Sequence, residues 1–127
     1  MEKKDLKPAG VFKYFEEICQ VPRPSKKEEK MIAYLKAFGA KHNLETKVDE
    51  AGNVLIKKPA TPGKENLQTV VLQSHIDMVC EKNNDVQHDF LPDPIETEID
   101  GEWLKAKGTT LGADNGIGVA TEPVSYT

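Results

Sequence analysis

The chain has 127 residues, of which 38% are hydrophobic and 30% charged, an ordinary composition for a soluble globular protein. Its formal net charge is −4 and it contains no polybasic run, which argues against nucleic acid or an anionic membrane as a partner. No apolar stretch approaches the roughly 18 residues that cross a bilayer, and no secretory signal precedes the two isolated cysteines, so we expect a cytoplasmic protein.

The first third of the chain predicts two helices. Apolar residues recur at helical spacing through residues 8–20, and the two prolines of 21–24 should end this helix. Ser25 and Glu28 form a capping-box pattern, which predicts that a second helix begins at Ser25. We expect that helix to end between Gly39 and Asn43.

The pattern then changes from helical to extended. Alternating and turn residues predict two hairpins, with strands at 44–48, 53–57, 95–99 and 103–106. Residues 69–72 form an apolar run without alternation, which is typical of a strand buried on both faces. A long polar loop should occupy 81–94. The sequence therefore predicts an α/β domain with two N-terminal helices and a central mixed sheet.

One candidate site follows the predicted buried strand, in the segment Ser74-His75-Ile76-Asp77. In an extended chain His75 and Asp77 point to the same face. Such a pair suits a metal-ligating histidine whose second ring nitrogen is held by a carboxylate. Short H-x-D triplets also occur by chance, and on the triplet alone we favour a surface histidine without a function.

A second candidate is Asp114, in the glycine-rich segment 108–118. Glycines there allow unusual backbone conformations and a close approach of a ligand. Asp114 could instead cap a helix that begins at Asn115, and a carboxylate can cap and bind a metal at once. The segment lacks the Gly-Lys-Ser/Thr ending of a phosphate loop, and it does not follow a strand in a Rossmann-like unit.

The remaining reactive side chains predict no site. His42 lies near a helix C-terminus, where the helix dipole favours histidine, and His88 is expected in a solvated loop. Cys19 falls on the apolar face of the first helix, and Cys80 has no visible activating partner. The sequence has no G-x-S-x-G motif, which argues against a serine hydrolase.

Taken together, the ordered segments resemble one family. They are V-V-L-Q-S-H-I-D-M-V, N-D-V-Q-H-D-F-L-P-D-P-I, D-G-E-W-L-K-A-K-G and T-T-L-G-A-D-N-G-I-G-V-A, preceded by V-F-K-Y-F-E-E-I-C-Q-V-P-R-P-S. The chain resembles the aminoacyl-histidine dipeptidases (Xaa-His dipeptidases, peptidase D) of the M20 metallopeptidase group, from about residue 8 to 120. The resemblance implies hydrolysis of small peptides by a cytoplasmic enzyme with two divalent metal ions, usually zinc.

The resemblance also assigns roles to three residues. His75 matches a ligand of one metal, Asp77 the catalytic carboxylate that orients it, and Asp114 the carboxylate that bridges both metals. The resemblance implies that the general-base Glu and the other ligands of the family come after the glycine-rich segment, so we expect them beyond Thr127, and we expect the family's second domain to be absent from residues 1–127. We therefore expect residues 1–127 to be the N-terminal portion of the catalytic domain, and expect Pro123 to break the last helix.

Two expectations and two alternatives follow. We expect little or no peptidase activity from this chain alone, since it offers a metal only two ligands. We also expect this chain to form homo-oligomers, because strands from a larger sheet would have exposed edges. The alternatives are a non-catalytic binding domain that retains the fold, and another M20 peptidase or amidohydrolase with a different substrate.

Overall fold

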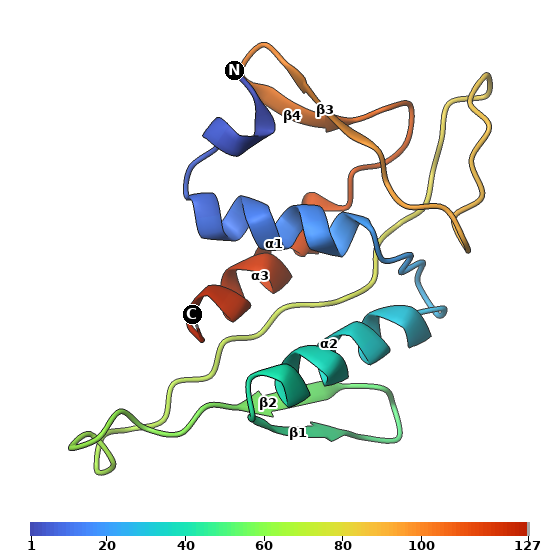
Figure 1. The fold of residues 1–127 in the computed structure, drawn as a ribbon. Helices are drawn as coiled ribbons and strands as arrows, with labels where there is room; N and C mark the ends of the chain where they lie inside the picture. The colour runs from blue at the N-terminus through green and yellow to red at the C-terminus, as the bar shows by residue number, and fades with distance from the viewer. Residues whose placement is uncertain (127) are drawn as a thin grey trace.

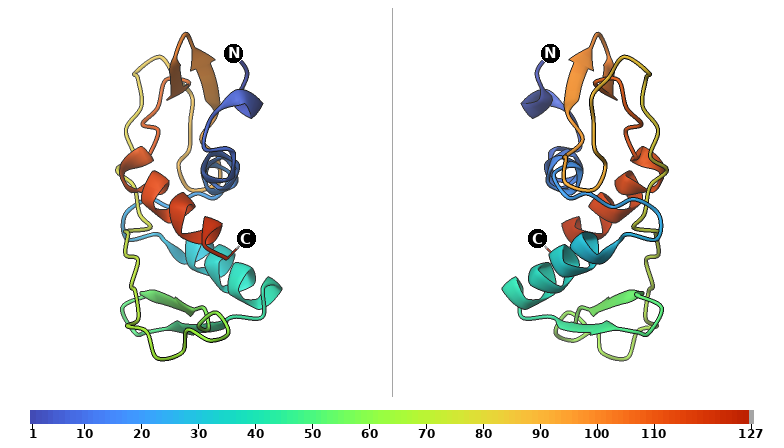
Figure 2. Two further views of the ribbon diagram at one scale, coloured as in Figure 1. Left: turned by 90° about the vertical axis from the view of Figure 1, so that its left-hand side faces the viewer. Right: turned by 90° about the vertical axis from the view of Figure 1, so that its right-hand side faces the viewer.

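A computed structural model describes residues 1–126 and shows three α-helices and two hairpins. Its elements are, in chain order, the 3₁₀ helix η1 (Lys3–Asp5), α1 (Ala9–Cys19), α2 (Glu29–Lys41), β1 (Glu45–Val48), β2 (Val54–Lys57), β3 (Thr97–Asp100), β4 (Trp103–Ala106) and α3 (Ala113–Val124). Helices α1 and α3 pack together in the middle, and the two hairpins lie at opposite ends (Figures 1 and 2). The α/β class is confirmed. Within residues 1–126, none of the helices has the length and apolar character that crossing a membrane requires.

The first helix agrees with its prediction. Helix α1 follows Pro8 directly and ends at Cys19, before the proline-containing stretch. The side chains of Tyr14, Phe15, Ile18 and Cys19 are buried, and their spacing of one, three and four residues puts them on one face of the helix.

The predicted start of the second helix is wrong. Helix α2 begins at Glu29, four residues after Ser25. Lys26 has a φ of +70°, outside the right-handed helical region, and the Ser25 hydroxyl donates to Asp77, while Glu28 accepts from the backbone N–H of Lys26 and not from that of Ser25. A long-range hydrogen bond therefore replaces the local capping box. The helix ends at Lys41, within the predicted range.

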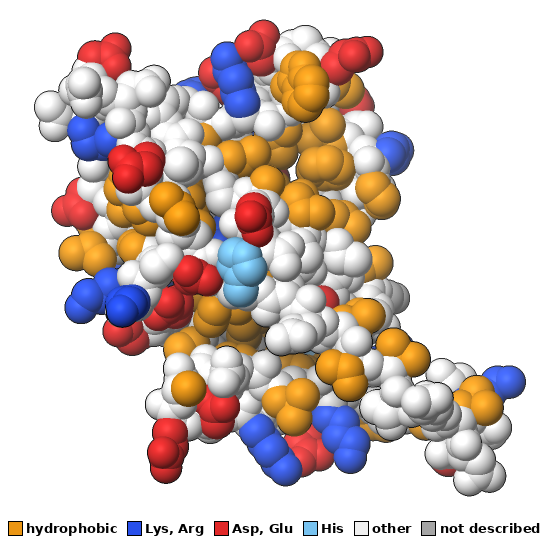
Figure 3. Space-filling model, turned by 180° about the vertical axis from the view of Figure 1, so that it is seen from behind, with side chains coloured by type: hydrophobic (Ala, Val, Ile, Leu, Met, Phe, Trp, Pro, Cys, Tyr) orange, Lys and Arg blue, Asp and Glu red, His pale blue; other side chains and the backbone are white. Residues whose placement is uncertain are grey.

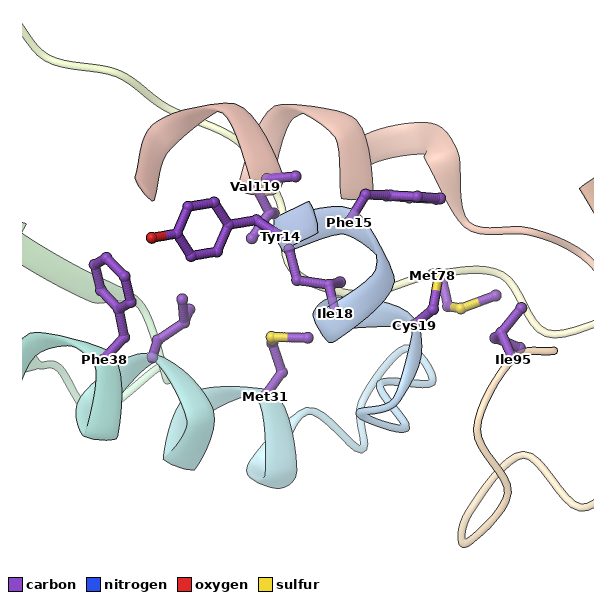
Figure 4. Close-up of a cluster of buried hydrophobic side chains, with 11 residues drawn as sticks. Tyr14, Phe15, Ile18, Cys19, Met31, Phe38, Met78, Ile95 and Val119 are labelled. Atoms are coloured by element: carbon purple, nitrogen blue, oxygen red, sulfur yellow. The ribbon is translucent and has the colours of Figure 1, made fainter. Parts of the chain in front are cut away.

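The core lies between the three helices (Figure 4). Its largest fully buried side chains are Phe15, Ile18, Met31 and Cys19. Val119 of α3 lies beside α1, and Phe38 extends the cluster along α2 (Figure 4). Because α3 follows directly on the glycine-rich segment, the packing of α3 against α1 also fixes where that segment lies.

Both predicted hairpins form. Strands β1 and β2 pair antiparallel from Glu45 opposite Lys57 to Val48 opposite Val54. Strands β3 and β4 pair antiparallel around the turn at Gly101, whose φ of +62° suits glycine. Helix α3 runs through Pro123 and ends at Val124, so Pro123 does not break the helix as predicted.

The predicted buried strand at 69–72 is wrong, and with it the central mixed sheet. The side chains of Val70 and Val71 are 81% and 75% exposed. Within the described residues, no strand pairs with this segment, and the only sheets are the two hairpins. The lack of alternation in this apolar run predicts burial on both faces, but a run can be buried only where a neighbouring layer covers it. In the structure, segment 69–72 is an extended, unpaired stretch of chain that runs along the molecule (Figure 1).

Candidate metal centre

The imidazole of His75 lies between two carboxylates. Its Nδ1 is 3.1 Å from Oδ1 of Asp77, and its Nε2 is 2.9 Å from Oδ1 of Asp114. The predicted same-face arrangement of His75 and Asp77 is therefore present, and Asp114 joins them from 39 residues further along the chain. The side chains of His75 and Asp114 are 52% and 96% exposed. Figure 3 shows a histidine on an open face beside acidic side chains.

The carboxylate of Asp77 has donors on both of its oxygens. Nδ1–H of His75 donates to Oδ1, and the Ser25 hydroxyl donates to Oδ2 at 2.5 Å. The Ser25 hydrogen bond is the main reason that the pKa of Asp77 lies below its ordinary value. With the Nδ1 proton held by Asp77, Nε2 is the nitrogen that points outward to a ligand.

A local turn presents Asp114. Gly112 has a φ of +76°, and Asp114 and Asn115 both depart from helical φ and ψ. The side chain of Asn115, not of Asp114, accepts from the backbone N–H of Gly118 at 3.1 Å and so caps the regular part of α3. The alternative in which Asp114 caps the helix is wrong, because its carboxylate contacts His75 instead.

The donor set of His75 and Asp114 fits part of a zinc site. An imidazole nitrogen and a carboxylate oxygen are both zinc ligands, and bonds of about 2.0–2.2 Å in a tetrahedron place two ligand atoms about 3.3 Å apart. The observed 2.9 Å needs to widen by only a few tenths of an ångström. Within residues 1–126, no three His, Cys, Asp or Glu side chains gather to hold a metal ion by themselves.

The other reactive side chains lie elsewhere, but the expectation of a solvated His88 is wrong, because its Nε2 is buried. His42 follows α2 and packs against Phe38, with ring centroids 4.4 Å apart. His88 packs against Phe90 at the same centroid distance. Burial raises the pKa of the Cys19 thiol to about 12, which makes it a poor nucleophile at neutral pH.

Sequence reasoning missed the residues that hold this site together. Arg23 is buried and donates to backbone carbonyls on both sides of the site, although the sequence suggested only that its segment ends a helix. Ser25 was interpreted as a helix cap. No local pattern distinguishes either role, because their partners lie more than 50 residues away.

The hydrogen bond to Asp114, followed by the interactions with Asp77, raises the pKa of His75 above its ordinary value of 6.5. We expect a metal-free NMR titration of the ring nitrogens to give a pKa above 6.5, and Asp114→Asn to lower it. Since the folded-state pKa is the raised one, these interactions stabilise the fold below pH 6.5 and lose that effect as the pH rises through the folded-state pKa. A pKa at or below 6.5 in the unchanged protein would contradict this prediction.

Comparison with known proteins supports the family resemblance. The chain is 51% identical over 120 residues to a cytosol non-specific dipeptidase of Escherichia coli, an alignment that covers 94% of this chain. It superposes on the crystal structure of an aminoacylhistidine dipeptidase from Vibrio alginolyticus over its whole length, with a TM-score of 0.93 and 52% identity. The resemblance to aminoacyl-histidine dipeptidases is thereby confirmed. No model of a protein family matches the sequence.

A more distant match concerns the fold alone. A tripeptidase from Staphylococcus aureus has a TM-score of 0.73 over 92% of this chain at 20% identity. In all three comparisons the chain spans a minor part of the other protein: 25% of the E. coli dipeptidase, 26% of the Vibrio structure and 31% of the tripeptidase.

Proposed function

We propose that this chain forms the first part of the catalytic domain of a cytoplasmic, metal-dependent dipeptidase of the M20 group. The observation that carries the proposal is the placement of the His75 ring between the carboxylates of Asp77 and Asp114. Sequence identity of 51–52% to two dipeptidases supports it. The free thiols of Cys19 and Cys80, and the cytosolic relative, support the cytoplasmic location.

In this proposal each of the three residues has a distinct role. His75 binds a zinc ion through Nε2, and Asp77 keeps the proton on Nδ1 and makes the ring a better ligand. Asp114 would hold the same ion through one oxygen, and its other oxygen, which has no partner within residues 1–126, would be available to a second ion. A pair of divalent ions bound there would activate a water and polarise the scissile carbonyl of a peptide.

The substrate class in the proposal is a dipeptide, with a C-terminal histidine as the preferred type. The printed names of the two relatives differ on this point, since one is a non-specific dipeptidase and the other an aminoacylhistidine dipeptidase. Comparing Xaa-His with matched dipeptides that lack histidine would decide between them. Because only His75 and Asp114 offer ligands here, we expect little or no hydrolysis by the 127-residue chain.

A Zn²⁺ titration by calorimetry tests the proposal most directly. We expect saturable binding, weaker than that of a structural zinc site with four protein ligands. The absence of saturable binding of Zn²⁺, Mn²⁺ or Co²⁺ would overturn the metal-centre part and favour the alternative of a non-catalytic domain. Metal-dependent hydrolysis of Xaa-His dipeptides by the chain alone would instead contradict the expected lack of activity.

We also propose that the exposed segment 67–72 promotes self-association. The side chains of Leu67, Val70, Val71 and Leu72 are between 55% and 81% exposed. An extended segment with unpaired backbone groups and apolar side chains is a ready partner for another strand. Sedimentation should show oligomers at high concentration, and Val71→Lys should reduce them. A monomer at all concentrations would contradict this proposal.

A further inference from the structure

The segment 23–25, between α1 and α2, runs alongside the segment that carries the candidate site. Pro24 and Met78 form a parallel bridge. The Met78 N–H donates to the carbonyl of Arg23 at 3.0 Å, and the Ser25 N–H donates to the carbonyl of Met78 at 3.2 Å. Asp77 is adjacent to this bridge, so its backbone position is fixed by residues 23–25.

The guanidinium of Arg23 connects the two halves of the site. One nitrogen, Nη1, donates to the carbonyls of Ile76 and Asp77, both at 3.2 Å, and Nη2 donates to the carbonyl of Gly112 at 2.7 Å. Ile76 and Asp77 belong to the segment that carries His75, whereas Gly112 is two residues before Asp114. The planar, forked guanidinium can make such bonds in fixed directions. Arg23 therefore sets the separation of the two segments.

Two glycines leave the space that this guanidinium occupies. A Cβ atom added at Gly112 or at Gly116 would lie 2.7 Å from Nη2 of Arg23. Such a contact is too short for carbon and nitrogen without movement of the guanidinium, which is only 2% exposed and is held by three acceptors. The absence of side chains at Gly112 and Gly116 therefore makes room for the Arg23 guanidinium, in the same segment that carries Asp114.

The hydroxyl of Ser25 then fixes the orientation of the Asp77 side chain. It donates to Oδ2 of Asp77 at 2.5 Å, while Oδ1 accepts from Nδ1 of His75. A carboxylate bonded through both oxygens to two different side chains cannot rotate freely about its terminal torsion. Nδ1 of His75 also lies 3.2 Å from the backbone carbonyl oxygen of Asp77. The direction of the His75 ring therefore depends on Ser25 in part, through the Asp77 carboxylate.

We propose that Ser25 and Arg23 are positioning residues for the metal centre, Ser25 by orienting the Asp77 carboxylate and Arg23 by holding the His75 and Asp114 segments at a fixed separation. The importance of this role for metal binding rests on the proposed function. The hydrogen-bonded arrangement itself exists without a metal and can be measured separately.

Ser25 is tested with Ser25→Ala, with Ser25→Thr, which keeps the hydroxyl, and with Ser74→Ala as the matched control. The Ser74 hydroxyl neighbours His75 but donates to Glu122. Loss of an outer partner of a metal ligand typically costs 10- to 100-fold in affinity. That direct partner is Asp77, and Ser25 acts on His75 only through Asp77. We therefore expect Ser25→Ala to weaken Zn²⁺ binding by up to about 10-fold, the lower end of that range, Ser25→Thr to restore most of the affinity, and Ser74→Ala to leave it unchanged. Equal Zn²⁺ affinity in Ser25→Ala and the unchanged protein would overturn the proposal for Ser25.

A second measurement, by ¹⁵N NMR on the metal-free protein, separates this proposal from the proposed function. The Nδ1–H signal of His75 should be protected from solvent exchange in the unchanged protein and in Ser25→Thr, and be measurably less protected in Ser25→Ala, where the backbone carbonyl of Asp77 remains as an acceptor. If neither the unchanged protein nor any variant binds Zn²⁺, the proposed metal centre is overturned. The protection of the Nδ1–H signal of His75 still tests the role of Ser25 in that case. For Arg23, we expect separate, slowly rotating Nη signals, and a single averaged signal would overturn its part.

Discussion

Replacing His75 with alanine should lower the affinity for Zn²⁺ at least about a hundredfold, to below detection for a site that has only two protein ligands. The substitution removes the Nε2 lone pair and leaves the carboxylate of Asp114, 96% exposed, as the remaining ligand. Replacing an outer partner costs 10- to 100-fold, so loss of the ligand itself should cost more. Calorimetric titration of the folded variant measures the effect.

The other two histidines and Asp77 supply matched controls. His42 and His88 each pack against a phenylalanine ring and do not contact His75, so His42→Ala and His88→Ala should bind Zn²⁺ as the unchanged protein does. Asp77→Ala should give an intermediate loss, since Asp77 acts through His75. Zn²⁺ binding that survives His75→Ala but disappears in His88→Ala would place the metal elsewhere and remove the basis of the proposed function.

Local patterns in the sequence predicted most of the secondary structure. Helix α1 and both hairpins depend on periodicity, prolines and turn residues that lie within a few positions of one another, and the structure agrees with them to within one or two residues. The start of α2 could not be predicted in this way. Lys26 leaves the right-handed helical region directly after Ser25, and the Ser25 side chain is held by Asp77, 52 residues away.

The error at 69–72 has a different cause. The apolar composition of this segment suits a strand that is buried between two neighbouring strands. Within the described residues, no strand lies beside it. A hydrophobic run indicates that a segment is suited to packing against other apolar residues, but it does not show whether those residues are present. The same limit applies to the predicted central sheet, which depended on that strand.

The site was predictable in part. The alternation of an extended chain placed His75 and Asp77 together, but spacing alone gave no reason to connect them with Asp114, and only the family resemblance did so. The structure supplies the physical connection: Arg23 bonds to both segments, and α3 is held against α1 by packing. Neither contact leaves a pattern in the local sequence.

Phe15→Ala should be the most destabilising of the substitutions considered, with a loss of about 3–5 kcal/mol in the free energy of unfolding. Phe15 is fully buried between α1 and α3 (Figure 4), and a Cβ added at Gly116 would lie 2.9 Å from its ring, which shows how closely α3 approaches it. Domains of this size have total stabilities of about 5–15 kcal/mol, so the midpoint of thermal unfolding should fall by roughly 10–20 °C. Urea and thermal unfolding followed by circular dichroism measure both quantities.

The matched control is Trp103→Ala, which removes an even larger aromatic side chain that is 76% exposed and should change stability by less than about 1 kcal/mol. A comparable loss in both variants would mean that the core is not where the structure places it. Because the regular part of α3 begins after Asn115, one residue beyond Asp114, Phe15→Ala should also weaken Zn²⁺ binding under conditions where the variant is still folded. Retention of full Zn²⁺ affinity in the folded variant would show that Arg23, rather than helix packing, holds Asp114 in place.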